Sequence, residues 1–215
     1  MATSSVAAIP PPPDPFDPLA EVVTEGMRLW RAHPLSRPAD SFNPTDSSGR
    51  FRPIRDTRNP ARTWVPTAYV GDSEDGAISE GPFHDLDVTG GPKHLPRSVV
   101  DTFALTPVVC GRDLRVVSLR GHGMRRVGAT QGTLIEPGPP AYRATAAWGQ
   151  AAYDASFDGL LWVSRQFPGG LALIVFARTD KPLKIDGPTL PLASGKGFEL
   201  LCAAANAAGV VIAEP

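Results

Sequence analysis

The sequence lacks the features that mark several large classes of protein. Only two of its 215 residues are cysteines, Cys110 and Cys202, and neither belongs to a CxxC pair. Two isolated thiols favour buried, reduced cysteines over a disulfide framework and agree with a reducing cytosol. No apolar run approaches the about 20 residues that a membrane helix needs. We therefore expect a cytoplasmic protein that does not act at a membrane.

An excess of charge of one sign is also lacking. The formal net charge is −1, so no basic field indicates direct contact with nucleic acid. The hydrophobic fraction of 42% and the charged fraction of 20% are ordinary for a globular protein. The length suits one domain with a sizeable core.

Common catalytic motifs are absent as well. None of the four histidines makes HxxxH or HExxH spacing, so we expect no metal site. The chain has no GxxxxGK[ST] loop, no GxGxxG after a predicted strand and no GxSxG elbow. The common nucleotide-binding folds and the triad hydrolases are therefore disfavoured.

The N-terminal 18 residues contain four consecutive prolines, residues 10–13, and no apolar core of a secretion signal. Such a composition is typical of a disordered or polyproline arm. We predict that residues 1–18 form this arm and that residues 19–215 form a single folded domain.

Strands outnumber helices in the predicted element order, which is mixed rather than strictly alternating. The apolar patterns predict strands at residues 27–33, 67–70, 99–109, 114–119, 159–163, 171–176, 183–185 and 210–212. They predict helices at residues 20–26, 73–80, 142–155 and 198–208, a long loop at residues 36–62, and a loop-rich stretch with room for one short helix at residues 121–140. This order favours an α+β fold with a twisted mixed β-sheet core and packed helices.

Chemically suited side chains lie at the ends of several predicted elements. A short apolar strand carries Tyr69, the helix after it carries Glu80, and another apolar strand ends at Ser164. Upstream, Arg31 and Arg50 lie in apolar settings. Together these cationic, aromatic, acidic and hydroxyl groups suit a polyanionic ligand with a cleavable glycosidic bond.

Four sequence blocks, in this order, resemble the RES domain family, which is named for Arg, Glu and Ser. They are LWR at 29–31, GRFRP at 49–53, AYV at 68–70 continuing to Glu80, and FDGLLWVSR at 157–165 followed by the apolar strand at 173–176. The resemblance spans about Met27 to about Ile185. An additional arginine-rich stretch after the second block leaves open whether Arg50 or Arg52 is the family's second arginine, and Arg50 fits the context better.

The resemblance implies a fold like that of the ADP-ribosyltransferases and an enzyme that consumes NAD+. Family members are typically toxins of bacterial toxin–antitoxin pairs, and their antitoxin is usually a DNA-binding protein of the Xre helix-turn-helix type. NAD+ would then be a substrate, with no bound cofactor. A homodimer is an option by resemblance alone.

The resemblance also suggests a role for each candidate residue. Arg31 and Arg50 would pair with the diphosphate, because a guanidinium binds phosphate oxygens in a bidentate way. Tyr69 would stack on nicotinamide or ribose. Glu80 would stabilise the oxocarbenium-like transition state, bind ribose hydroxyls or orient the nucleophile. Ser164 would hydrogen-bond the ribose or the amide.

Three functions remain open from the sequence. The first is cleavage of the nicotinamide–ribose bond of NAD+, with water or inorganic phosphate as acceptor, by a glycohydrolase or phosphorylase. The second is ADP-ribosyl transfer onto a protein target from the same pocket. The third is a non-catalytic nucleotide-binding module. The presence of all four residue types, cationic, aromatic, acidic and hydroxyl, argues against this third function.

Overall fold

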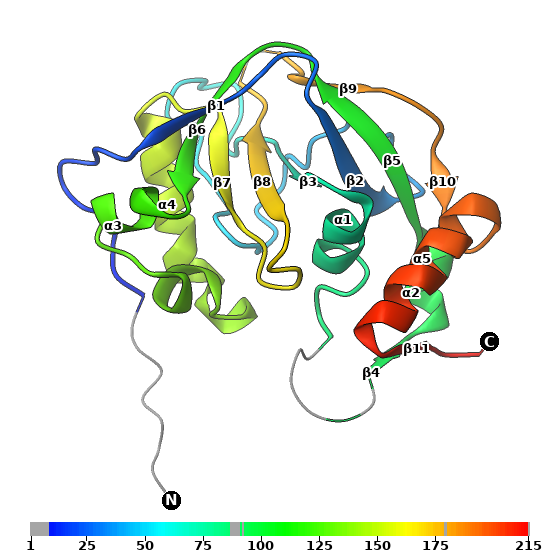
Figure 1. Cartoon of the computed structure of the whole chain (residues 1–215). Coiled ribbons are helices and arrows are strands. Elements are labelled where there is room, and N and C mark those ends of the chain that lie inside the picture. Colours follow the sequence, from blue (N-terminus) through cyan, green and yellow to red (C-terminus); the bar gives the residue numbers. More distant parts are fainter. Residues whose placement is uncertain (1–8, 87–90, 92, 179, 215) are drawn as a thin grey trace, which may run out of the picture.

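The computed structural model describes residues 9–86, 91, 93–178 and 180–214 (Figure 1). Its α-helices are α1 (Glu74–Glu80), α2 (Arg97–Thr102), α3 (His122–Arg126), α4 (Tyr142–Asp154) and α5 (Gly195–Ala208). A π-helical turn, η1 (Gln131–Ile135), and a 3-10 turn, η2 (Pro139–Ala141), precede α4. The strands are β1 (Ala20–Val23), β2 (Arg28–Pro34), β3 (Thr67–Gly71), β4 (Lys93–Leu95), β5 (Phe103–Cys110), β6 (Leu114–Leu119), β7 (Gly159–Val163), β8 (Leu171–Phe176), β9 (Leu183–Ile185), β10 (Leu190–Pro191) and β11 (Val210–Ile212).

Nine strands form one curved mixed sheet. Eight of them follow the order β1-β6-β7-β8-β3-β2-β5-β10, and β9 also pairs with β5. The β6–β7 pair is parallel and the other pairs of this sheet are antiparallel. The strands β4 and β11 form a separate parallel pair. The expected α+β class with a twisted mixed sheet is confirmed.

The sheet is weakest at its centre, between β2 and β3. These two strands share one residue pair, Trp30 with Gly71. By contrast, β2 pairs with β5 over seven residues and β3 pairs with β8 over five. We call this junction of β2 and β3 the seam. Because only one residue pair joins the two strands there, the two halves of the sheet diverge and leave room for a pocket.

Helices cover the two halves of the sheet separately. Figure 1 shows α3 and α4 beside β6 and β7, and α2 and α5 beside β5 and β10, with α1 between the two groups. Trp148 of α4 belongs to one buried cluster with Trp162 of β7, while Ile78 of α1 and Leu201 of α5 belong to another. Helix α1 therefore lies where it can carry a side chain to the seam.

The described part of the N-terminal segment contacts the folded domain. Residues 1–8 lie outside the described residues, and residues 9–18, predicted as part of a disordered or polyproline arm, pack on the domain. The indole Nε1 of Trp148 donates to the Pro10 carbonyl at 2.8 Å, and Phe16 meets the Trp148 ring edge-on. The apolar side chains of Ile9 and Phe16 pack against the buried cluster that contains Trp148. The run of prolines between them gave no indication of this packing.

Two element assignments also differ from the sequence-based prediction. Residues 20–26 were predicted as a helix, but Ala20–Val23 form the edge strand β1 against β6. Two adjacent β-branched valines favour a strand when a partner is available. Residues 99–109 were predicted as one strand, but helix α2 occupies Arg97–Thr102 and β5 begins at Phe103. Pro96 precedes this helix, and an ion pair between Arg97 and Asp101, one turn apart, supports it.

Candidate functional site

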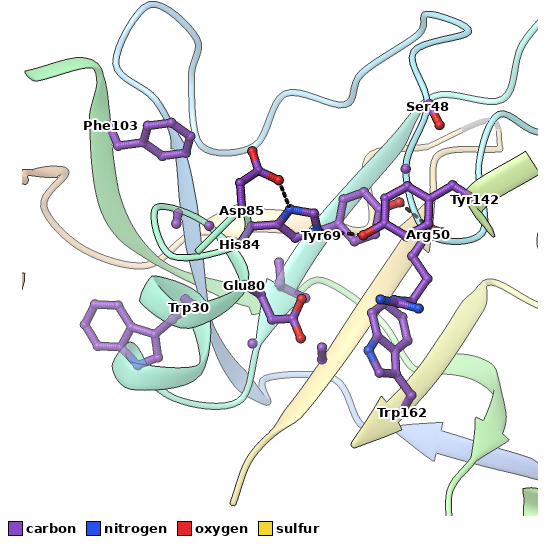
Figure 2. A pocket seen from close by; sticks show the side chains of 17 residues that line it. Trp30, Ser48, Arg50, Tyr69, Glu80, His84, Asp85, Phe103, Tyr142 and Trp162 are labelled. Carbon is purple, nitrogen blue, oxygen red and sulfur yellow. Dashed lines mark hydrogen bonds and ion pairs between the residues drawn. The ribbon is translucent and has the colours of Figure 1, made fainter. Parts of the chain in front are cut away.

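A pocket of about 330 Å³ opens at the seam of the sheet. This volume falls in the lower part of the range for small-molecule sites. Both strands of the seam and helix α1 contribute to its wall, together with the loop before β3 and the start of α4. The polar and aromatic side chains of this wall are those of Trp30, Ser48, Arg50, Tyr69, Glu80, His84, Asp85, Phe103, Tyr142 and Trp162 (Figure 2).

Glu80 is the last residue of the short helix α1. The hydroxyl of Ser73 caps the helix by accepting from the Gly76 backbone N–H at 3.1 Å. At the other end, a Cβ on Gly81 would lie 2.5 Å from the Ala32 side chain on β2. Glycine at this position therefore lets α1 end directly against β2, which brings Glu80 to the pocket wall.

Ser164 fixes the Glu80 carboxylate. Its hydroxyl donates to Glu80 Oε1 at 2.6 Å and accepts from the Phe167 backbone N–H at 2.9 Å. The Ser164 side chain is buried and does not line the pocket. The two predicted residues do come together, but Ser164 touches Glu80 where we had expected a contact with the ligand itself.

Arg50 presents its guanidinium on the opposite wall from Glu80 (Figure 2). Nη1 donates to the carbonyls of Leu134 and Pro137, and the guanidinium lies 5.2 Å above the centre of the Tyr142 ring. Burial lowers the pKa of Arg50. Among the described residues, no salt bridge within 4.0 Å involves Arg50 or Glu80. A buried cation without an ion pair suits an anionic ligand.

Tyr69 holds the segment that carries Arg50. Its phenol donates to the backbone carbonyl of Arg50, and burial raises the pKa of this phenol. A Cβ on Gly49 would lie 2.8 Å from the Tyr69 hydroxyl, so glycine allows this close approach without a shift of the phenol. The Tyr69 ring lines the pocket and also packs edge-on against Trp162.

Arg31, unlike Ser164, neither lines the pocket nor hydrogen-bonds to a residue that does. Trp30 and Ala32 of β2 line the pocket, so the alternation of the strand turns Arg31 to the opposite face. There its guanidinium donates to the carbonyls of Ala39 and Ser41. Burial lowers the pKa of Arg31 to about 10. The geometry gives Arg31 a role in holding the loop after β2, and its expected contact with the ligand has no support from the pocket.

The additional arginines after Arg50 do not line the pocket either. Arg52 is buried, donates to the Thr45 carbonyl at 2.9 Å and has its pKa lowered by burial. Arg58 donates to the Asp154 carbonyl and Arg62 to the Asp56 carboxylate. These contacts attach the arginine-rich loop to α4 and to itself. Of the two arginines left open by the sequence, Arg50 is the one in the pocket wall.

Sequence reasoning missed several residues of the wall. His84 was one of four histidines without metal-binding spacing, and Tyr142 was considered only as the start of a helix, yet both line the pocket and hydrogen-bond to each other at 2.9 Å. Trp162 was noticed only as part of a family block. Its Nε1 is buried, and no described residue accepts a hydrogen bond from it. In Figure 2 the Trp162 ring lies below the Arg50 guanidinium with this nitrogen on the side of Glu80.

Two classes of site have no support in the described parts of the chain. Within residues 9–86, 91, 93–178 and 180–214, no group of three or more His, Cys, Asp or Glu side chains is placed to hold a metal ion. No helix in the same ranges is long and apolar enough to cross a membrane. The polar groups that line the pocket are the carboxylates of Glu80 and Asp85, the guanidinium of Arg50, the phenols of Tyr69 and Tyr142, the imidazole of His84, the hydroxyl of Ser48 and the indoles of Trp30 and Trp162.

These features define a pocket for a small polar ligand at the seam between β2 and β3. Comparison with known proteins identifies the family of the fold. The family model of the RES domain matches residues 28–193. The chain therefore belongs to the RES domain family.

Among solved structures, the chain is similar to one in the crystal structure of the M. tuberculosis MbcT–MbcA toxin–antitoxin complex. The TM-score is 0.58 and the sequence identity is 18%, and the alignment covers 84% of this chain and 92% of the other. At this identity the likeness shows a shared fold. No curated protein matches the sequence.

Proposed function

We propose that the chain is a toxin-like enzyme that cleaves the nicotinamide–ribose bond of NAD+. The observation that carries the proposal is the placement of a fixed carboxylate, Glu80, opposite a buried guanidinium, Arg50, in one pocket. Membership of the RES family and the likeness to a chain of a toxin–antitoxin complex support it.

The chemistry requires these two charges to act at different ends of the substrate. When the bond breaks, both electrons stay with the nicotinamide nitrogen, and the ribose is left with positive charge on its anomeric carbon and ring oxygen. A carboxylate that already faces this position gains attraction only as the charge develops, which lowers the barrier. Glu80 supplies the carboxylate, and the Ser164 hydroxyl holds one of its oxygens at 2.6 Å.

The other groups would bind the dinucleotide. Arg50 would pair with the diphosphate through the nitrogens that do not bind Leu134 and Pro137. The indole N–H of Trp162 would donate to an oxygen of the substrate, which would give this buried donor the partner that the described residues do not provide. Tyr69 would offer its ring as a stacking surface while its hydroxyl holds the Arg50 backbone.

We further propose that a helix-turn-helix antitoxin of the Xre type neutralises this activity. Depletion of NAD+ would stop growth, so a cell that makes the enzyme would need such a partner. The structural neighbour is a chain of a toxin–antitoxin complex, which supports an antitoxin partner for this chain.

Expression of the wild type and of a Glu80→Gln variant in a bacterial host tests the proposal. The wild type should stop growth and lower cellular NAD+, whereas the variant, made in equal amount, should do neither. Purified wild type should release nicotinamide from NAD+, together with ADP-ribose in water or its phosphorylated form in phosphate. Label from NAD+ found mainly on protein would instead indicate ADP-ribosyl transfer, and tight binding of NAD+ without any turnover would indicate a non-catalytic module.

A further inference from the structure

Three side chains on the wall of the pocket form a continuous hydrogen-bonded chain. The Asp85 carboxylate lies 2.9 Å from His84 Nδ1, and His84 Nε2 lies 2.9 Å from the Tyr142 hydroxyl (Figure 2). All three residues line the pocket, next to Glu80. None of these three side chains has a role in the cleavage step proposed above.

The chemistry of the three side chains determines which group donates and which accepts in each of the two hydrogen bonds. An ionised carboxylate can only accept, so the proton of a neutral His84 lies on Nδ1 and its Nε2 is an acceptor. The Tyr142 hydroxyl then donates to Nε2. Burial raises the pKa of Tyr142, against the opposing effect of the nearby Arg50 and Arg165, so the phenol holds its proton at neutral pH. Its oxygen lone pairs remain available to a further donor.

Solvent exposure increases from Tyr142 through His84 to Asp85. Tyr142 is 4% exposed, whereas the side chains of His84 and Asp85 are 32% and 88% exposed. A proton that enters at the Tyr142 oxygen can therefore leave at Asp85 without crossing the pocket. The backbone of His84 is also fixed, because Gln166 donates to its carbonyl at 2.6 Å from the loop that carries Ser164.

We propose that Tyr142, His84 and Asp85 form a proton relay that activates water as the acceptor of the ribosyl group. This inference rests on the proposed NAD+ cleavage. The water oxygen forms a bond to the anomeric carbon as the bond to nicotinamide breaks. One water proton passes to the Tyr142 oxygen while the Tyr142 proton passes to His84 Nε2. The imidazolium so formed faces Asp85, and the products are ADP-ribose and neutral nicotinamide.

Inorganic phosphate does not need this relay. Its dianion already carries an unprotonated oxygen, so attack on the anomeric carbon gives phosphorylated ADP-ribose with no proton to remove. The relay therefore predicts that the choice between two acceptors depends on Tyr142 and His84. A purely structural role of these residues would lower both reactions together.

The test measures both products from NAD+ at a fixed phosphate concentration for the wild type, Tyr142→Phe and His84→Gln. Tyr142→Phe keeps the ring under Arg50 and removes only the hydroxyl, and His84→Gln removes the imidazole base. We expect the ratio of ADP-ribose to its phosphorylated form to fall by about tenfold or more in both variants. His122→Gln, which alters an exposed histidine outside the pocket wall, should keep the wild-type ratio.

A wild-type ratio in either folded variant would overturn the relay. Folding is checked by thermal unfolding, and the wild type gives a second test that needs no variant. In deuterium oxide, formation of ADP-ribose should slow more than formation of the phosphorylated product, because only the first moves a proton; equal slowing would refute the relay. A wild type that makes the phosphorylated product and no ADP-ribose would refute it too. A wild type that consumes no NAD+ at all would instead refute the proposed function.

Discussion

The hydroxyl of Ser164 donates to Glu80 Oε1 at 2.6 Å and joins two residues that are 84 positions apart in the sequence. Ser164 follows β7 in one half of the sheet, and Glu80 ends the helix that packs against β2 and β3 at the seam. The contact holds a carboxylate at the seam, where the two halves of the sheet share one residue pair. This places a fixed negative charge at the point where the fold leaves space for a ligand.

The first prediction concerns this contact. Ser164→Ala removes the donor that orients Glu80, and we expect kcat for NAD+ cleavage to fall by about tenfold with little change in KM. In a Glu80→Asp background, where the shorter side chain no longer reaches the hydroxyl, the same change should alter the residual rate by only about twofold or less. Equal losses in the two backgrounds would show that Ser164 acts independently of Glu80.

The second prediction concerns the unpartnered indole. Trp162→Phe keeps an aromatic ring in the wall but removes the N–H, and we expect KM for NAD+ to rise by about tenfold, as for one lost hydrogen bond. Trp148→Phe is the matched control, because its N–H bonds the Pro10 carbonyl away from the pocket. That variant should lose stability and keep its KM. If both variants keep the wild-type KM, Trp162 makes no bond to the substrate.

The third prediction separates the two arginines. Arg50→Lys should raise KM for NAD+, because lysine cannot reproduce a planar bidentate contact with diphosphate. Arg31→Met should act on stability, since it leaves the carbonyls of Ala39 and Ser41 without their buried donor. A loss of about 2 kcal/mol would lower the unfolding midpoint by about 5 °C. A raised KM with unchanged stability for Arg31→Met would instead place Arg31 at the ligand.

The fourth prediction concerns stability in acid. Burial alone would raise the pKa of Asp56, but hydrogen bonds from Tyr153, Arg62 and the backbone N–H groups of Arg58 and Asn59 outweigh burial and lower it. A carboxyl with a lowered folded pKa stabilises the fold fully above its unfolded pKa of about 3.9 and loses this contribution as the pH falls through its folded value.

Asp56→Asn should therefore cost about 1 to 3 kcal/mol of unfolding free energy at neutral pH and less as the pH falls below about 4. Urea unfolding of both proteins across this range measures the difference. Asp101→Asn, at an exposed surface pair, should change little at either pH. A difference between wild type and Asp56→Asn that does not shrink in acid would contradict the assigned role of Asp56.

The sequence predicted the strands and helices that carry the site, because their patterns are local. The strand with Tyr69, the helix ending at Glu80 and the strand before Ser164 all lie where apolar runs and turn residues indicated them. Strand faces were harder to predict. Nothing local shows that Trp30 turns to the pocket and Arg31 away from it, because β2 carries apolar side chains on both faces, with Leu29 on one and Trp30 on the other.

The rest of the site depends on contacts between distant segments. His84 and Tyr142 are 58 residues apart and meet only after α4 packs beside the seam. Ser164 follows a strand, where its hydroxyl could contact either a ligand or a neighbouring side chain. It contacts Glu80 because α1 packs at the seam. A sequence therefore shows which groups are available, while the packing of α1 and α4 selects those that converge.

The most direct test of the account is to incubate purified wild type and Glu80→Gln with NAD+, with and without phosphate, and to quantify every product. The account predicts release of nicotinamide by the wild type and a loss of at least about 100-fold in the variant, with the unfolding midpoint preserved. Nicotinamide release at the wild-type rate by a folded Glu80→Gln protein would contradict it.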